Sequence, residues 1–272
     1  ARGFMTATPR VVLTVAGSDP SGGAGLQGDL KTIHQHGGYG AAVPTLITVQ
    51  NSFGVEQVEH LSAALVRSQL ANLLGDLEPR AAKMGALGSR AVVHVLGSIM
   101  GKTDFPWVVD PVWLPSRGRP LARGDVIDAY KETVLPRAAL VTPNAQEAAL
   151  LAERPVRTVA DAREAALVIH ELGAAAVLVK GGHLEDEGRG TDVLLVGGEL
   201  REIRPSEVVA GQFHGTGCAL SAAIATRLAF GEPIPEAVIK AKDWLGAALR
   251  EAFAVGEDIK PVNHLVRVRN KP

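Results

Sequence analysis

Short runs of apolar, largely β-branched residues alternate with helical patterns along most of this chain, and that alternation restricts the folds it can adopt. The expected strands span residues 11–15, 43–49, 107–109, 139–141 and 175–179. Apolar residues at helical spacing cover residues 26–33, 61–74 and 161–172 between these strands. Because strands and helices that alternate in this way form α/β folds, we predict a mainly parallel central sheet with helices on both faces.

The pattern changes after residue 190, where two apolar segments flank a glycine pair. Residues 191–196 and 199–204 surround Gly197-Gly198, which predicts a tight antiparallel hairpin at one edge of the sheet. Two helices are expected after the hairpin, over 219–230 and over 235–253, the second with a proline in its first turn.

The domain organisation follows from the distribution of the 30 glycines and 16 prolines, which are not gathered into a linker. We therefore expect a single domain over residues 11–272 after a flexible N-terminal segment, residues 1–10. Within that segment we interpret Met5 as the natural first residue and Ala1–Phe4 as an addition to it.

Charge and composition exclude several classes of partner. The 28 basic residues are balanced by 29 acidic ones, and only 4% of residues are aromatic, so neither phosphate-backbone binding nor base stacking is expected. No apolar run approaches the roughly 18 residues of a membrane span. The single cysteine excludes an internal disulfide and favours a cytoplasmic location.

The strongest local motif is His214-Gly215-Thr216-Gly217-Cys218, directly before an apolar helix. Glycines allow the backbone to approach a ligand, and the free N–H groups of a helix start attract phosphate oxygens or a developing anion. A helix N-terminus can also lower the pKa of a thiol, so Cys218 could serve as a base or a nucleophile. The alternative is a glycine turn before a buried helix with a small buried cysteine.

Polar and glycine-rich motifs also follow other expected strands. The glycine-rich turn 17–25 lacks the spacing of a dinucleotide-binding loop, and Asp29 beyond it is either functional or a solvated acid in the first helical turn. Asn144 and Glu147 form either a capping box or ligands for hydrated Mg²⁺. Since ligands of α/β sheets bind at the carboxyl ends of strands, we expect these motifs to converge with Asp110 and Lys180.

The eight histidines provide no spacing typical of a metal site. His34 and His36 are two residues apart and would not face the same way on a helix, so we expect both on the surface near a helix end.

Taken in order, these motifs resemble those of the hydroxymethylpyrimidine/phosphomethylpyrimidine kinases of thiamine biosynthesis. The resemblance rests on 15–25 with Gln27 and 29–31, 48–51, 83–87, 109–112, 142–144 with Glu147, 180–184, 214–218, 220–224 and 261–264. It covers nearly the whole chain.

The resemblance implies a ribokinase-like fold, a homodimer and ATP-dependent phosphorylation of 4-amino-5-hydroxymethyl-2-methylpyrimidine and then of its monophosphate. The residues that would line the pyrimidine pocket are Gly17, Asp29, Gln50, Ala86 and Val112. Those that would surround Mg²⁺ and ATP are Asp110, Asn144, Lys180 and, as a water-mediated metal ligand, Glu147. The backbone of Gly215, Thr216, Gly217 and Cys218 would hold the transferred phosphoryl group, with Cys218 where related sugar kinases have an aspartate base.

Two segments depart from the family pattern. Residues 114–121 replace a loop of the type Ala-Lys-Ser-Gly-Asp-Pro-Leu, and Arg117 and Arg119 would take over a phosphate contact there. Residues 211–213, Gly-Gln-Phe, replace a usual Lys-Asn-Thr among the expected ATP contacts.

Three alternatives stay open at this point. A pyridoxal or pyridoxine kinase of the same superfamily would act on a similar ring with a hydroxymethyl arm. A cysteine hydrolase would use Cys218 as a covalent nucleophile and need no ATP. A non-catalytic protein would bind the pyrimidine without turnover.

Overall fold

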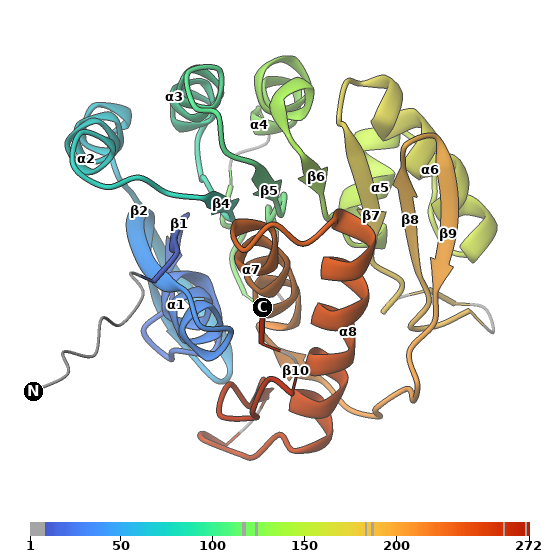
Figure 1. The fold of residues 1–272 in the computed structure, drawn as a ribbon. Coiled ribbons are helices and arrows are strands. Elements are labelled where there is room, and N and C mark those ends of the chain that lie inside the picture. Colours follow the sequence, from blue (N-terminus) through green and yellow to red (C-terminus); the bar gives the residue numbers. More distant parts are fainter. Residues whose placement is uncertain are drawn as a thin grey trace, which may run out of the picture.

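A nine-stranded sheet runs through the computed structural model, which describes residues 9–115, 118–122, 125–182, 184–185, 188–257, 259–269 and 271–272. The strand order is β3-β2-β1-β4-β5-β6-β7-β8-β9, as Figure 1 shows. The strands are β1 (Val11–Ser18), β2 (Tyr39–Asn51), β3 (Gly54–His60), β4 (Ala81–Met84), β5 (Trp107–Val109), β6 (Leu140–Val141), β7 (Ala176–Val179), β8 (Asp192–Val196) and β9 (Glu199–Ile203).

The six central strands, β2, β1, β4, β5, β6 and β7, are parallel, and antiparallel strands extend both edges. β1, β4, β5, β6 and β7 are buried on both faces, which explains their continuous apolar runs, whereas β2 is partly exposed. The hairpin β8–β9 turns at Gly197-Gly198, both with positive φ, and confirms the edge hairpin expected from the sequence. The predicted α/β fold is confirmed.

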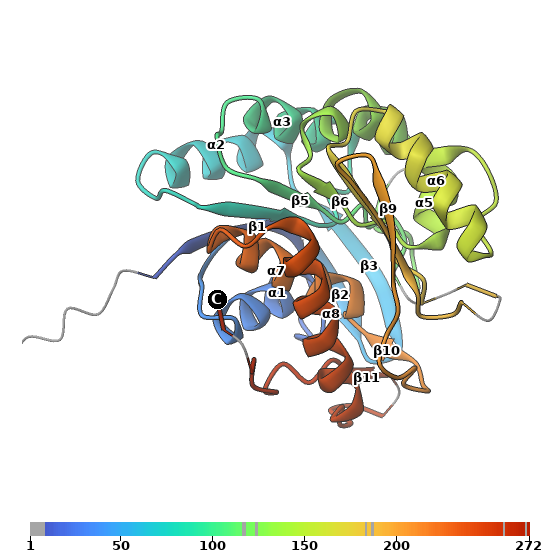
Figure 2. The same cartoon turned by 45° about the vertical axis from the view of Figure 1, so that its right-hand side comes forward.

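Helices cover both faces of the sheet (Figures 1 and 2). One face carries α1 (Gly25–Gln35), α7 (Thr216–Ala229) and α8 (Ile234–Arg250). The other carries α2 (Ala63–Leu74), α3 (Arg90–Met100), α4 (Val126–Ala129), α5 (Ala145–Ala152) and α6 (Val159–Glu171), with a π turn Tyr130–Val134 and a 3-10 turn Leu135–Arg137 after α4. Two large hydrophobic cores result, one on each side of the sheet, and a small third cluster contains Leu46, Val55, Ala86 and Leu121.

Several elements have no counterpart in the sequence prediction, among them the sheet strands β3 and β4 and the helix α3. β3 is largely polar because it is a partly exposed edge strand, paired antiparallel with β2. β4 contains a lysine, Lys83, yet all four of its residues are buried. A charged residue in a buried strand requires a partner elsewhere in the fold, and local patterns do not reveal one.

His36 corrects an expectation. His34 is exposed as expected, but His36 is completely buried, with its ring at 4.7 Å from that of Trp244 in an edge-on arrangement. Its Nδ1 lies 3.0 Å from the Thr32 carbonyl oxygen. α8 covers this residue, so its position at the end of α1 does not make it a surface residue.

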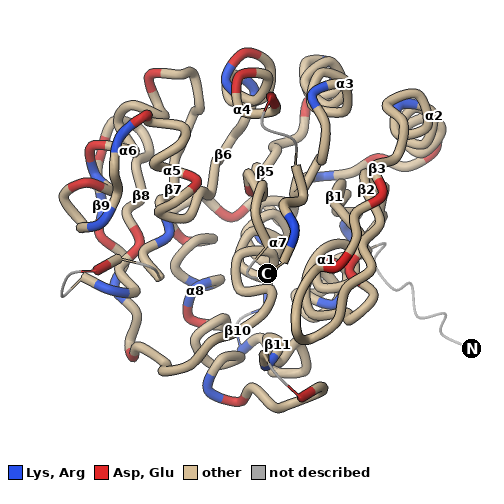
Figure 3. The backbone as a smooth tube through the Cα atoms, turned by 180° about the vertical axis from the view of Figure 1, so that it is seen from behind, with Lys and Arg blue, Asp and Glu red and all other residues tan. Residues whose placement is uncertain are grey.

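The remaining features concern the ends and the surface. A second, two-stranded sheet pairs β10 (Phe213–His214) with β11 (Lys260–Pro261) beside the start of α7. Residues 1–8, including the expected start at Met5, lie outside the described residues. Basic and acidic residues are interspersed along the elements in Figure 3. Within the described part of the chain, no helix combines the length and apolarity required to cross a bilayer.

Candidate active site

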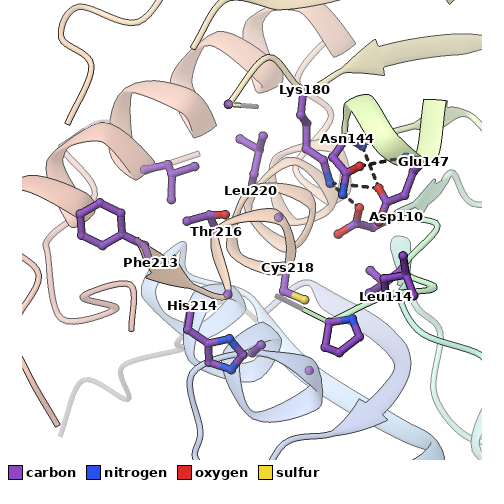
Figure 4. A pocket seen from close by; sticks show the side chains of 18 of the residues that line it. Asp110, Leu114, Asn144, Glu147, Lys180, Phe213, His214, Thr216, Cys218 and Leu220 are labelled. Atoms are coloured by element: carbon purple, nitrogen blue, oxygen red, sulfur yellow. Dashed lines mark hydrogen bonds and ion pairs between the residues drawn. The ribbon is translucent and has the colours of Figure 1, made fainter. Parts of the chain in front are cut away.

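A cavity of about 660 Å³ lies at the carboxyl ends of the parallel strands. The ends of β1, β2, β4, β5, β6 and β7 contribute to its wall, together with the first turn of α7 and the inner face of α8. The strand-end motifs expected to converge therefore do so. Figure 4 shows the arrangement: Asp110, Asn144, Glu147 and Lys180 gather at one end, Cys218 lies in the middle and His214 lies at the other end.

The start of α7 forms the floor of the cavity. Gly215 precedes the helix with φ +82°, and no side chain caps the helix. The backbone N–H groups of Thr216, Gly217 and Cys218 therefore remain available to an anion, as expected from the sequence. A β-carbon on Gly215 would collide with the Gly23 carbonyl oxygen, so the glycine allows the two glycine-rich segments to touch.

Cys218 lines the cavity at this helix start, but its pKa differs from the expectation. Burial raises the pKa of the thiol to about 11, and the nearby positive charge of Lys83 only partly opposes that rise. A position in the first turn of a helix was expected to lower the pKa. Cys218 is therefore a neutral thiol at neutral pH.

Two carboxylates share one lysine at the opposite end of the cavity. Lys180 Nζ lies 2.6 Å from Asp110 Oδ1 and 4.0 Å from Glu147 Oε2. The Asn144–Glu147 capping box is present: the Asn144 N–H donates to Glu147 Oε2 at 2.7 Å, and the Glu147 N–H donates to Asn144 Oδ1 at 2.9 Å. Burial, together with the charge of Asp110, raises the pKa of Glu147 to about 7 despite Lys180. Two carboxylates around one lysine leave negative charge in excess here when both are ionised.

This excess suits a cation held jointly with a ligand. Among the described residues, no group of three or more His, Cys, Asp or Glu side chains could hold a metal ion alone. Mg²⁺ commonly takes one or two carboxylates and completes its shell with phosphate oxygens and water. Asp110 and Glu147 fit that requirement, and the capping-box role of Glu147 leaves its second oxygen for a hydrated ion.

Four of the five expected pyrimidine contacts, Gly17, Gln50, Ala86 and Val112, line the cavity. Asp29 does not line it. Its carboxylate is fully buried, accepts from Thr14 Oγ1 at 2.6 Å and pairs with Lys83 Nζ at 2.8 Å. The expectation of a pocket residue and the alternative of a solvated acid are therefore both wrong for Asp29.

The two divergent segments also meet the cavity. Leu114, Pro115 and Leu121 line it, whereas Arg119 does not, and Arg117 lies outside the described residues. Gly211, Gln212 and Phe213 line it, as do Leu245 and Leu249 of α8, and Gly-Gln-Phe makes this lining more apolar than the usual Lys-Asn-Thr would.

Sequence reasoning missed two groups of cavity residues. Lys83 was detectable as a charge inside an apolar segment. Asp19 and His214 lie in motifs that the sequence analysis singled out for their glycines, yet their side chains meet at 2.7 Å across 195 residues of chain. No local signal indicates that pairing.

Comparisons with known proteins agree with this geometry. A family model described as phosphomethylpyrimidine kinase matches residues 19–263. A hydroxymethylpyrimidine/phosphomethylpyrimidine kinase from Rhizobium meliloti is 42% identical over 260 residues, which cover 94% of this chain and 97% of that protein.

Solved structures are similar over most of the chain. The phosphomethylpyrimidine kinase from Clostridium difficile has a TM-score of 0.77 and 34% identity, covering 88% of this chain and 99% of that one. The pyridoxal kinase from Staphylococcus aureus in complex with AMP-PCP and pyridoxal has a TM-score of 0.87 and 30% identity, covering 96% of both chains.

Proposed function

This chain belongs to the phosphomethylpyrimidine kinase family, and we propose that it transfers the γ-phosphoryl group of ATP to the hydroxymethyl group of 4-amino-5-hydroxymethyl-2-methylpyrimidine, and then to the resulting monophosphate. The observation that carries this proposal is the uncapped start of α7, which lies between the Asp110–Lys180–Glu147 cluster and the pocket of Gly17, Gln50, Ala86 and Val112. A phosphate site therefore adjoins a small-ring site.

The chain's own groups supply the positioning and charge that phosphoryl transfer needs. The N–H groups of Thr216, Gly217 and Cys218 would donate to the oxygens of the transferred group, and Lys180 would place a positive charge beside them. A backbone donor of this type is worth about 2.7–4 kcal/mol in a transition state. Mg²⁺, held through Asp110 and Glu147, would neutralise charge on the phosphate oxygens when bound.

Gly217 must remain small for this arrangement. A β-carbon at this position would lie 3.0 Å from Lys180 Nζ and 3.4 Å from Asp110 Oδ2. The glycine therefore brings the helix start close to the charged cluster, and the phosphates of a nucleotide would contact both.

Cys218 would orient the acceptor hydroxyl as a neutral thiol. Because its pKa is about 11, only a small fraction of Cys218 would be thiolate at neutral pH. A loose phosphoryl-transfer transition state demands little proton removal before the phosphorus–oxygen bond forms. We therefore assign the positioning of the hydroxyl to the neutral thiol, and late acceptance of the hydroxyl proton to the small thiolate fraction of Cys218.

Pyridoxal is the second candidate acceptor. The likeness to the Staphylococcus aureus pyridoxal kinase, whose complex holds AMP-PCP and pyridoxal, favours testing it, since both rings carry a hydroxymethyl arm. The family match and the Rhizobium meliloti relative favour the pyrimidine.

The test is ADP release by the purified full chain with ATP and Mg²⁺, supplied separately with the pyrimidine alcohol, its monophosphate and pyridoxal. We expect turnover with both pyrimidines, and kcat/KM for the alcohol at least about tenfold above that for pyridoxal. Lys180→Ala should lose that turnover, whereas Lys131→Ala, a lysine paired with Glu153 and not part of the cavity lining, should not. No ADP release with either pyrimidine would refute the proposal, and a preference for pyridoxal would replace it with the second candidate.

We further propose a cytoplasmic location and a homodimer. The single cysteine supports the first, because it suits a reducing compartment. The resemblance to the family supports the second, and light scattering of the purified chain would test it.

A further inference from the structure

Three polar side chains meet at the ring end of the cavity: Gln50 of the expected ring pocket, and Asp19 and His214, which the reaction scheme does not use. His214 Nε2 lies 2.7 Å from Asp19 Oδ2 and 3.2 Å from Gln50 Nε2. His214 and Gln50 line the cavity, and Figure 4 places His214 at the end opposite Lys180.

Asp19 can only accept in this contact. Its Oδ1 accepts from the Ser21 N–H and its Oδ2 from the Ala24 N–H, both at 2.9 Å. Burial alone would raise the pKa of Asp19, but the hydrogen bonds from His214 and Ser21 lower it below its ordinary value. The carboxylate is ionised, so His214 Nε2 must carry a proton and donate it to Asp19.

A protonated Nε2 determines how the Gln50 amide must be turned. A nitrogen that donates to Asp19 cannot also accept from the Gln50 NH₂ group at 3.2 Å. The oxygen and nitrogen of an amide are assigned by their hydrogen-bond partners. The Gln50 amide must therefore point its oxygen, and not its NH₂ group, toward His214. Gln50 Oε1 then accepts from His214 Nε2–H.

The other side of the amide supports the same orientation. Thr48 Oγ1 lies 2.9 Å from the Ser18 carbonyl oxygen and 3.1 Å from the other terminal atom of Gln50. The hydroxyl has one proton, which the Ser18 carbonyl takes. Thr48 Oγ1 must therefore accept from Gln50, as it does when the amide in this orientation presents its NH₂ group to it.

We propose that the Asp19–His214 pair fixes the orientation of the Gln50 amide and thereby selects acceptor rings that carry a ring nitrogen beside an amino group. With one lone pair of Oε1 used by His214 and one N–H used by Thr48, Gln50 keeps one donor and one acceptor for the ligand. An aminopyrimidine offers the complementary acceptor and donor on adjacent ring positions. This inference rests on the proposed function; His214 is a positioning residue in it and touches no reacting atom.

A spectroscopic test does not depend on turnover. In the full chain, a long-range ¹H–¹⁵N correlation spectrum of the histidine rings should show the His214 Nε2 protonated from pH 6 to pH 8, assigned by the loss of its signals in His214→Gln. A neutral ring protonated on Nδ1 alone would overturn the proposal, because that ring would accept from the Gln50 NH₂ group instead. This result stands even if the chain proves not to phosphorylate a pyrimidine.

A kinetic test uses two variants whose amide side chains differ only in length. The amide nitrogen of His214→Gln can take the place of Nε2, whereas that of His214→Asn takes the place of Nδ1. We expect His214→Asn to raise KM for the pyrimidine alcohol about tenfold, with kcat and KM for ATP changed less than about twofold, since an unmade hydrogen bond costs about 1–3 kcal/mol. We expect His214→Gln to restore most of that KM.

Two further variants complete the kinetic test. Gln50→Glu should raise KM for the alcohol, because a carboxylate still accepts from His214 but has no N–H to donate to the ring nitrogen. His94→Asn, an exposed histidine on α3, should behave as the wild type. Equal losses in His214→Asn and His214→Gln, or a loss confined to kcat, would overturn the positioning role. Thermal unfolding of each variant identifies any loss of activity that comes from misfolding. In that case the ring-proton measurement on the wild type decides whether His214 Nε2 donates to Asp19.

Discussion

Cys218 and Glu147 are both titratable groups whose protonation depends on burial more than on their place in a helix. Each lies in the first turn, Cys218 of α7 and Glu147 of α5, where the helix dipole favours a negative charge. Burial nevertheless raises the pKa of both, to about 11 and about 7. Desolvation therefore outweighs the helix dipole, which contributes at most about 2 kcal/mol.

The role assigned to Cys218 predicts a specific pH dependence. If Cys218 accepts the hydroxyl proton, kcat for the pyrimidine alcohol rises with pH from 7 to 10, because the thiolate fraction rises below the pKa of about 11. Cys218→Ala should lower kcat about a hundredfold, within the usual range for a lost base, and flatten the profile. Steady-state rates across this range measure both effects. Near-normal turnover of Cys218→Ala would contradict a proton-accepting role.

At the scale of elements, the site depends on how closely the start of α7 approaches the turn between β1 and α1. Gly215 lies against the Gly23 carbonyl oxygen, and Gly25, with φ +55°, lies against the Gly17 carbonyl oxygen. Two loops from distant parts of the chain are thus in backbone contact. This contact places the N–H groups of α7 beside the ring end of the cavity.

A pair of glycine variants at the two ends of α7 separates this contact from backbone strain. Gly215 and Gly231 both have positive φ, +82° and +86°, but a β-carbon on Gly231 meets nothing within 4 Å. We expect Gly215→Ala to lower kcat/KM at least about a hundredfold, as the loss of an oxyanion donor does. Gly231→Ala should keep activity and lose about 1 kcal/mol of unfolding free energy, which denaturant titration measures. Equal activity in the two variants would show that the contact with Gly23 is dispensable.

At the scale of the whole molecule, two buried histidines couple the fold to pH. Burial lowers the pKa of His36 to about 4 from 6.5, and burial with the charge of Lys31 lowers that of His264 to about 4. The fold favours the neutral rings, so the unfolded chain binds more protons between pH 4 and pH 6.5. Stability is complete above pH 6.5 and falls as the pH drops through this interval.

Acid should therefore destabilise the chain through His36. Between pH 7 and pH 4.5 we expect the unfolding free energy to fall by up to about 3 kcal/mol for this residue. His36→Asn, whose amide can still donate to the Thr32 carbonyl, should reduce the slope of unfolding free energy against pH, whatever it does to absolute stability. His94→Asn is the exposed control. An unchanged slope in His36→Asn would show that another group causes the acid sensitivity. Denaturant titrations at several pH values provide the measurement.

Local sequence determined the repeating strand–helix order, the hairpin at Gly197-Gly198, the helix start at Gly215–Cys218 and the strand ends that meet at the cavity. These features depend on apolar periodicity and on glycine, which act over a few residues, and so they could be predicted. Only the tertiary structure decided the ionisation and pairing of the site. Asp29 meets Lys83 across 54 residues of chain and Asp19 meets His214 across 195. Burial and charge depend on neighbours that the fold brings together, so the pKa of Cys218, the burial of His36 and the orientation of Gln50 follow from packing rather than from any local pattern.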